Sequence, residues 1–111
     1  MAIPSGSGTE VFKLSTIDGA SGDTNHVLIT GVANHIYIIK TVTLTEISGN
    51  AEEFSLMAGA VHYMYKQALA GYGCFVWNDT IIVSGATNFI VRIHAAANVD
   101  ITCSYIDQDF T

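Results

Sequence analysis

Short runs of apolar residues alternate with polar ones along most of the chain, and turn residues interrupt the runs about every ten positions, as in antiparallel β proteins. The predicted strands cover residues 10–17, 26–30, 35–47, 53–58, 61–67, 74–77, 80–83, 88–94 and 99–106. Most connections are too short for crossovers between parallel strands, so the strands should pair antiparallel. The sequence therefore predicts an all-β fold, an antiparallel two-sheet sandwich of about eight strands with jelly-roll or immunoglobulin-like connections.

The longest run, residues 35–47, shows the alternation most clearly. Successive side chains of a strand point to opposite faces. On this basis one face is expected to hold Ile36, Ile38, Val42 and Leu44. The other face is expected to hold Thr41, Thr43 and Thr45 with Tyr37 and Ile39. The first half of this run is apolar on both faces, which indicates cover on both sides, by a loop or by another subunit. Branched residues dominate the run and disfavour a helix. A short helix could compete with strands only over residues 54–69.

A run of aromatic residues follows in the second half of the chain: Tyr63, Tyr65, Tyr72, Phe75 and Trp77. Aromatic side chains can anchor an interface or stack on sugar rings, and they also fill cores. We treat these five residues as candidate interface residues, with core packing as the alternative for at least half of them.

Residues 1–9 differ from the rest of the chain, because they hold its one proline among small glycine and serine residues. This composition predicts a flexible N-terminal arm ahead of a single β-sandwich domain at residues 10–111. The arm is either a free terminus or a segment that orders against a neighbouring subunit. In the second case Ile3 and Pro4 are its candidate interface residues.

Charged residues make up only 13% of the chain, against about 25% in a typical soluble domain. A domain of 111 residues normally covers its large surface with charge. The deficit favours a surface that is partly buried against other protein chains, where charged residues are depleted. The alternative is a monomer coated with Ser, Thr and Asn.

The charge balance narrows the choice of partners. The net charge is −6, and the four basic residues, Lys13, Lys40, Lys66 and Arg92, stand far apart in the sequence. Binding to nucleic acid or to an anionic membrane needs clustered basic residues, so neither partner is expected. The chain opens without a signal-peptide pattern, which predicts synthesis and assembly in a cytoplasm, where Cys74 and Cys103 should be free thiols.

No local motif indicates catalysis or a cofactor. The chain lacks a Gly-x-Ser-x-Gly elbow and a glycine-rich phosphate loop, and its histidines, at positions 26, 35, 62 and 94, lack metal-ligand spacing. The segment 18–25 gathers two carboxylates and an amide, as calcium loops do, but turns of this composition are common without metal. We therefore expect no enzyme activity, no metal and no cofactor.

Three segments resemble small β-sandwich structural proteins encoded by tailed bacteriophages: HIYIIKTVTLTE at residues 35–46, NAEEFSL at 50–56 and QALAGYGCFVWND at 67–79, with VDITCSYID at 99–107 matching the closing strand. The likeness extends over most of residues 24–107. It implies a virion component, most simply a capsid decoration (cement) protein that stabilises the shell. It further implies a homo-oligomer, with a trimer favoured, bound to the phage major capsid protein or to neck or tail proteins.

Two alternatives to decoration remain at the sequence level. The first is a neck or tail accessory protein, which the same resemblance allows. The second is a carbohydrate-binding module for host recognition that uses Trp77 and the neighbouring tyrosines. A hydrolase on a jelly-roll scaffold has no motif to support it, and a fold alone does not imply a function.

Overall fold

The computed structural model describes residues 9–95 and 97–111, and these residues form nine strands. The strands are β1 (Thr9–Ala20), β2 (Thr24–Ile29), β3 (His35–Glu46), β4 (Glu52–Ala58), β5 (Val61–Leu69), β6 (Cys74–Trp77), β7 (Ile81–Ser84), β8 (Phe89–Ile93) and β9 (Val99–Asp109). Within these ranges no helix has the length and apolarity needed to span a membrane. The predicted all-β sandwich is confirmed, and every predicted strand is present.

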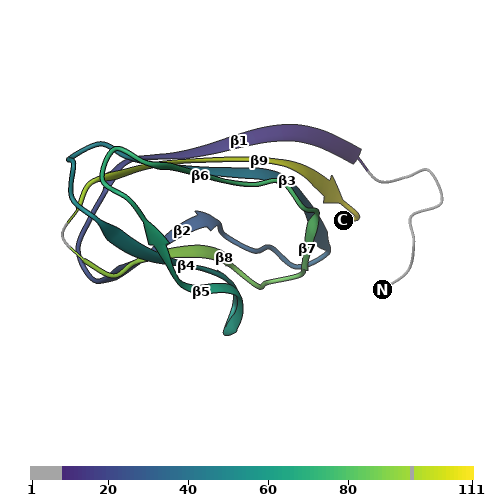
Figure 1. Cartoon of the computed structure of the whole chain (residues 1–111). Helices are drawn as coiled ribbons and strands as arrows, with labels where there is room; N and C mark the ends of the chain where they lie inside the picture. The colour runs from purple at the N-terminus through teal and green to yellow at the C-terminus, as the bar shows by residue number, and fades with distance from the viewer. Residues whose placement is uncertain (1–8, 96) are drawn as a thin grey trace.

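The strands form two antiparallel sheets that lie one over the other (Figure 1). The five-stranded sheet has the order β1-β9-β3-β6, with β7 also paired to β3, and the four-stranded sheet has the order β2-β8-β4-β5. β6 and β7 both pair with β3 and can be counted as one interrupted strand. The first strand then pairs with the last (β1 with β9), the second with the second-to-last (β2 with β8), and β3 with β6 and β7, while the hairpin of β4 and β5 is innermost. This nested pairing is the jelly-roll connection, so the immunoglobulin-like alternative is wrong.

The core lies between the two sheets and is almost entirely apolar. Its largest fully buried side chains come from both sheets and include Phe54, Phe89, Ile39, Leu44, Leu56, Ile81, Ile93 and Ile101. Phe54 on β4 packs edge to face against Phe75 on β6, with ring centroids 4.9 Å apart, and so joins the two sheets. Aromatic contacts of this kind add to the stabilisation that burial alone gives.

A bulge at Lys40 changes which residues of β3 face the core. Ile39 pairs with Tyr105 and Thr41 with Ser104, so Lys40 is an extra residue without a partner on β9. Such an insertion reverses the alternation beyond it. The core side therefore holds Tyr37 and Ile39, and then Val42 and Leu44. The predicted grouping of Ile36 and Ile38 with Val42 and Leu44 is wrong for this reason.

The first strand runs three residues further than predicted. β1 continues through Asp18 and Gly19 to Ala20, with an irregularity after Ile17. Gly19 has a φ of 65°, a value that suits glycine, and its N–H donates to Asp100 Oδ1 at 2.8 Å. The predicted loop at 18–25 is thus shorter, and its Asp18 belongs to the strand.

The segment in which a helix could compete, residues 54–69, forms β4 and β5 instead. Two irregularities in the pairing of these strands separate the residues that alternation would place together. Met64 packs on the core, whereas Tyr63 contacts Trp77 and Tyr65 contacts His62. Tyr63 and Tyr65, although two residues apart on one strand, therefore lie in different surroundings.

Glu46, at the end of β3, organises the turn that leads to β4. Its buried carboxylate accepts hydrogen bonds from the backbone N–H groups of Ser48, Gly49 and Asn50, and from the Tyr72 N–H at 3.3 Å. Burial acts to raise the pKa of Glu46, but the hydrogen bonds from Ser48, Tyr72 and Gly49 outweigh it and lower the pKa to about 2.

The low pKa of Glu46 predicts a pH-dependent contribution to stability. Because the folded state holds the pKa below its ordinary value of about 4.3, this contribution is present above that value and is lost as the pH falls toward about 2. Glu46→Gln should be less stable than wild type at pH 7, and the difference should shrink between about pH 4.5 and 2. Urea denaturation across this range measures it. An equal difference at pH 7 and pH 2 would contradict the assignment.

A second prediction compares a core phenylalanine with a surface one. Phe54 is fully buried, so Phe54→Ala should lower the free energy of unfolding by about 3–5 kcal/mol. Phe12, on the outer side of β1, is 78% exposed, so Phe12→Ala should change it by no more than about 0.5 kcal/mol. Denaturant unfolding at low protein concentration tests the pair, and similar losses in both variants would contradict the described core.

Candidate assembly surface

A row of large apolar side chains crosses the outer face of the five-stranded sheet, on the side away from the core. Phe12 on β1 pairs with Ile106 on β9, Ile106 pairs with Ile38 on β3, and Ile38 pairs with Ile82 on β7. Directly paired residues point to the same side of a sheet, so the four side chains form one continuous line. We call these four residues the apolar row.

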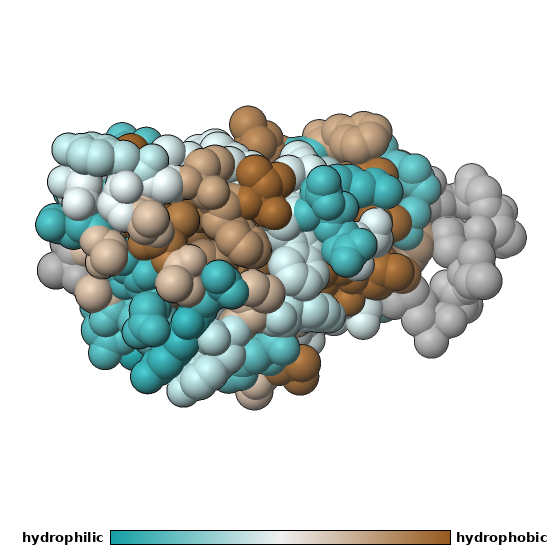
Figure 2. All heavy atoms as spheres, viewed as in Figure 1, coloured by the Kyte–Doolittle hydropathy of each residue, from teal (hydrophilic) through white to brown (hydrophobic). Residues whose placement is uncertain are grey.

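The apolar row is accessible at both ends. Phe12 is 78% exposed and Ile82 is 63% exposed, while Ile38 and Ile106 between them are half-buried. Leu14, two residues along β1 on the same side, is also exposed. Figure 2 shows apolar side chains standing out along the layer that contains β1. A contiguous exposed apolar patch on a small protein is a signature of an interaction site.

The rest of this face carries few charges, among them Lys40, which is exposed at the bulge of β3. Further along the strands, the paired outward residues are Thr16, Thr102, Thr43 and Val76. The outward positions of β1 carry a charge only near its ends, at Glu10 and Asp18. The face thus matches the centre of a protein interface, which is depleted in charge and rich in apolar groups.

β1 also forms an open edge. Among the described residues, β1 pairs with β9 along one side, in unbroken register from Thr9 to Ile17. The strands at the other sheet edges are interrupted: β2 and β5 contain register shifts, and β6 and β7 are two short pieces. A long regular edge offers free backbone N–H and C=O groups to another chain, whereas bulged or short edges do not.

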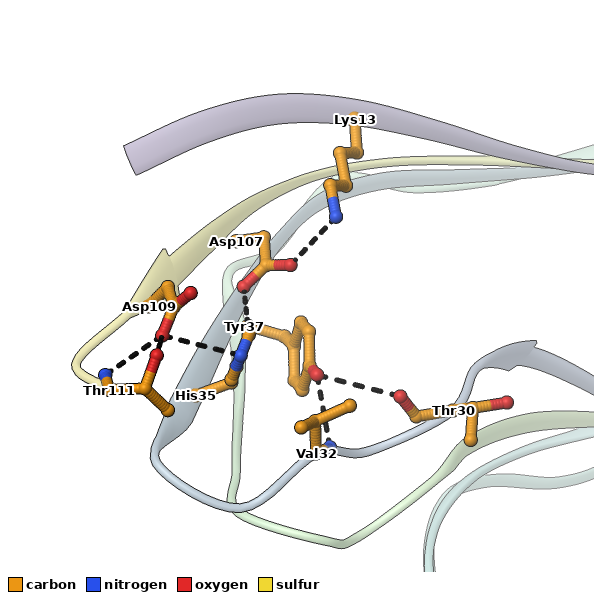
Figure 3. Close-up of polar contacts among 8 residues, drawn as sticks. All are labelled: Lys13, Thr30, Val32, His35, Tyr37, Asp107, Asp109 and Thr111. Carbon is orange, nitrogen blue, oxygen red and sulfur yellow. Dashed lines mark hydrogen bonds and ion pairs between the residues drawn. The ribbon is translucent and has the colours of Figure 1, made fainter. Parts of the chain in front are cut away.

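An ionic cluster beneath the apolar row holds β1, β3 and β9 together (Figure 3). Lys13 Nζ donates to Asp107 Oδ2 at 2.9 Å, and His35 Nδ1 donates to Asp107 Oδ1 at 2.7 Å. His35 Nε2 lies 3.4 Å from Asp109 Oδ1, which also accepts hydrogen bonds from Thr111. Asp107 is buried, and each of its carboxylate oxygens accepts a hydrogen bond from a residue on a neighbouring strand. A buried charge needs such partners.

The pKa shifts follow from these contacts. Burial acts to raise the pKa of Asp107, but the hydrogen bonds from Lys13 and His35 outweigh it and hold the pKa below its usual value. The hydrogen bond that Lys13 donates to Asp107 raises the pKa of Lys13. Close by, burial raises the pKa of Tyr37, whose hydroxyl accepts a hydrogen bond from the Val32 N–H at 3.0 Å (Figure 3). Lys13 and Asp107 are therefore both ionised near neutral pH.

The structure distributes the predicted interface residues over several places. Tyr65 and Tyr72 are mostly exposed, and Tyr63 is partly exposed, with its ring centroid 6.3 Å from that of Trp77. Trp77 is half-buried against the core, and its indole N–H donates to the Asp79 carbonyl at 2.9 Å. Phe75 is partly buried and packs against Phe54 of the core. Ile3 and Pro4 lie outside the described residues.

No sequence motif marked the residues of the apolar row, because each of them resembles an ordinary strand residue. The available signal was the first half of residues 35–47, which is apolar on both faces and includes Ile38. Ile38 indeed lies on the outer face. Finding Phe12, Ile82 and Ile106 beside it requires the strand register, which the sequence does not contain.

Of the two cysteines, Cys103 is buried in the core, whereas Cys74 is exposed on β6, two residues from the outward-facing Val76. Cys74 and Cys103 are free thiols, and burial raises the pKa of Cys103 to about 12. Asp23 forms an ion pair with Arg92 at 2.7 Å. In residues 9–95 and 97–111, no three His, Cys, Asp or Glu side chains are grouped to hold a metal ion.

Three solved structures are similar to the chain in fold. A chain of the virus-like particle of the extra small virus of the giant freshwater prawn Macrobrachium rosenbergii has 11% identity and a TM-score of 0.59, over 100% of this chain and 85% of that one. A chain of the disulfide-linked pili that form Bacillus endospore appendages has 15% identity and a TM-score of 0.58, over 100% and 97%. A chain from the acid-stable capsid of Helicobacter pylori bacteriophage KHP30 has 12% identity and a TM-score of 0.52, over 91% and 92%.

At these identities the likeness establishes the fold, and two of the three chains come from virus particles. The sequence matches no protein-family model, and no curated protein is similar to it in sequence.

Asp107→Asn tests the ionic cluster. The change removes the charge that Lys13 and His35 share, and it should lower the free energy of unfolding by about 1–3 kcal/mol at pH 7. Since the pKa of Asp107 is lowered in the folded state, the wild-type advantage should be lost as the pH falls below about 4. Asp79→Asn makes the same chemical change at an exposed loop position and is the control. Equal losses in the two variants would mean that the cluster contributes nothing specific.

Proposed function

We propose that this chain is a non-enzymatic structural subunit of a virus particle, and that its copies assemble by burying the outer face of the five-stranded sheet. The apolar row of Phe12, Ile106, Ile38 and Ile82 is the observation that carries the proposal. A monomer gains nothing from a line of large apolar residues in water, whereas an assembly gains about 1.5–3 kcal/mol for each such side chain that it buries.

The jelly-roll fold and the low charge support the same role. Proteins with this fold form virus particles, as two of the similar structures illustrate, but the fold also serves other functions. The low charge is explained by a surface that is hidden in the assembly. Within this role we propose a capsid decoration protein of a tailed bacteriophage, with a trimer as its oligomeric state and the major capsid protein as its partner.

Two functions other than capsid decoration are also considered. A neck or tail accessory protein would use the same apolar surface at a lower copy number. A carbohydrate-binding module would need an exposed stacking platform, and Trp77 is half-buried with its indole N–H bonded to Asp79. The structure thus favours Tyr65 or Tyr72, which are exposed, over Trp77 as any sugar-stacking residue.

The double variant Phe12→Ser with Ile82→Ser tests the assembly surface. It removes both exposed ends of the apolar row and leaves the core unchanged, so the monomer should fold normally. Self-association, measured by sedimentation velocity over a range of concentrations, should weaken by at least about 100-fold. Thr16→Ser with Thr43→Ser changes the polar end of the same face and should preserve the association. Wild-type protein that stays monomeric at millimolar concentration and fails to bind particles would overturn the proposal.

Virus particles provide the second test. Quantitative mass spectrometry of purified virions should detect this chain at hundreds of copies if it decorates the capsid, and at a small fixed number if it belongs to a neck or tail. Its absence from virions would exclude the decoration role and the neck or tail role.

A further inference from the structure

The outer face of the four-stranded sheet, on the opposite side of the sandwich, carries a polar hollow of about 400 Å³. Residues of β2, β4, β5 and β8 line it, together with Asp23 before β2 and His94 after β8. The lining includes Lys66, Arg92, His62 and His94. A hollow of this size can hold a small ligand of one or two rings.

The basic residues of the chain are concentrated at this hollow. The whole chain has four Lys and Arg residues and four His residues, with a net charge of −6. Lys66 and Arg92 are two of the four, and His62 and His94 are two of the other four. One carboxylate in the lining, that of Asp23, opposes them. An acidic protein thus gathers half of its basic side chains around a single hollow.

The guanidinium of Arg92 is held in place by two neighbours. Its Nη2 donates to Asp23 Oδ1 at 2.7 Å, and its Nη1 donates to Asn25 Oδ1 at 3.1 Å. A guanidinium has five N–H donors, so three are left for a ligand. Two fixed contacts reduce the entropy that Arg92 would lose on binding, which is how preorganised sites gain affinity.

A buried hydroxyl supports the floor of the hollow. Ser55 is fully buried, its Oγ lies 2.9 Å from His94 Nε2, and it accepts a hydrogen bond from the Lys66 N–H at 3.0 Å. His94 Nδ1 lies 3.9 Å from Asp23 Oδ1. The order Ser, His, Asp resembles a catalytic triad, but a fully buried serine is not placed to attack an external substrate. Ser55 therefore positions its two neighbours.

The wall of the hollow is built on a strained residue. Lys66 has a φ of 48°, which non-glycine residues rarely adopt, and it lies at a register shift between β4 and β5. Lys66 Nζ lies 5.8 Å from the centroid of the Tyr65 ring, and the His62 and Tyr65 rings meet edge to face with centroids 5.0 Å apart. Backbone strain of this kind often occurs at binding sites.

We propose that this hollow binds an anionic group, a carboxylate or a phosphate, carried by a small ligand. Arg92 and Lys66 supply charge-assisted hydrogen bonds, and the exposed ring of Tyr65 offers a flat face for a ring attached to the anion. The site is independent of the assembly surface, because it lies on the other sheet.

NMR titration of the ¹⁵N-labelled chain tests the site, with glucuronate, inorganic phosphate and neutral glucose as probes at low salt. Glucuronate or phosphate should shift the amide signals around Arg92, Lys66 and His94 with a Kd on the order of 1–10 mM, and about 0.2 M NaCl should weaken binding. Whichever anion binds more tightly identifies the chemical source of the group. Glucose should cause no comparable shifts.

Charge-removing variants complete the test. Lys66→Gln should weaken anion binding about tenfold, and Arg92→Gln by at least as much. Lys40→Gln removes the same charge at the exposed bulge of β3, away from the hollow, and should leave the Kd unchanged. If Arg92→Gln fails to fold, the comparison of Lys66→Gln with Lys40→Gln shows whether the charge at the hollow contributes to anion binding. The proposal is overturned if neither anion shifts these signals at 50 mM, if glucose binds as tightly as glucuronate, or if the two lysine variants behave alike.

Discussion

The pairing of β9 with two strands at once is the constraint on which the rest of the molecule depends. β9 is hydrogen-bonded to β1 on one side and to β3 on the other along almost its whole length. Because side chains alternate, Ile101 and Cys103 enter the core while Ile106 joins the apolar row. A slip by one residue would exchange these faces. The same ladder therefore builds both the interior of the sandwich and the surface that we assign to assembly.

The sequence was sufficient to locate the strands, but it was not sufficient to assign which of their side chains face the core. Turn residues and branched apolar runs located every strand to within a few residues, since both signals are local. The bulge at Lys40 has no local signal, so simple alternation assigned Ile36 and Ile38 to the wrong side. The same reason applies to the site, because only long-range pairing places Ile82 and Ile106 beside Ile38, and Phe12 beside Ile106. Assigning alternate residues to opposite faces is reliable only along a stretch of strand that contains no bulge.

The structure makes the shortage of surface charge more severe than composition suggests. Three of the ten acidic residues, Glu46, Glu52 and Asp107, are buried. Each satisfies donors that the fold would otherwise leave unpaired: Glu46 caps a turn, Glu52 accepts the N–H groups of Glu53 and Ala95, and Asp107 joins three strands. These carboxylates are therefore structural, and fewer charges remain to keep the surface hydrated. This strengthens the argument that part of the surface is covered by other chains.

The two outer faces of the sandwich are chemically different, and this difference lets two roles coexist. The five-stranded sheet presents mostly uncharged residues around Phe12 and Ile82, which suits contact with protein. The four-stranded sheet presents Lys66 and Arg92 around a hollow, which suits a hydrated anion. Since a jelly roll places its two sheets back to back, burying the first face leaves the second open to solvent. A subunit that packs through the five-stranded sheet would thus keep its anion site accessible on the assembled particle.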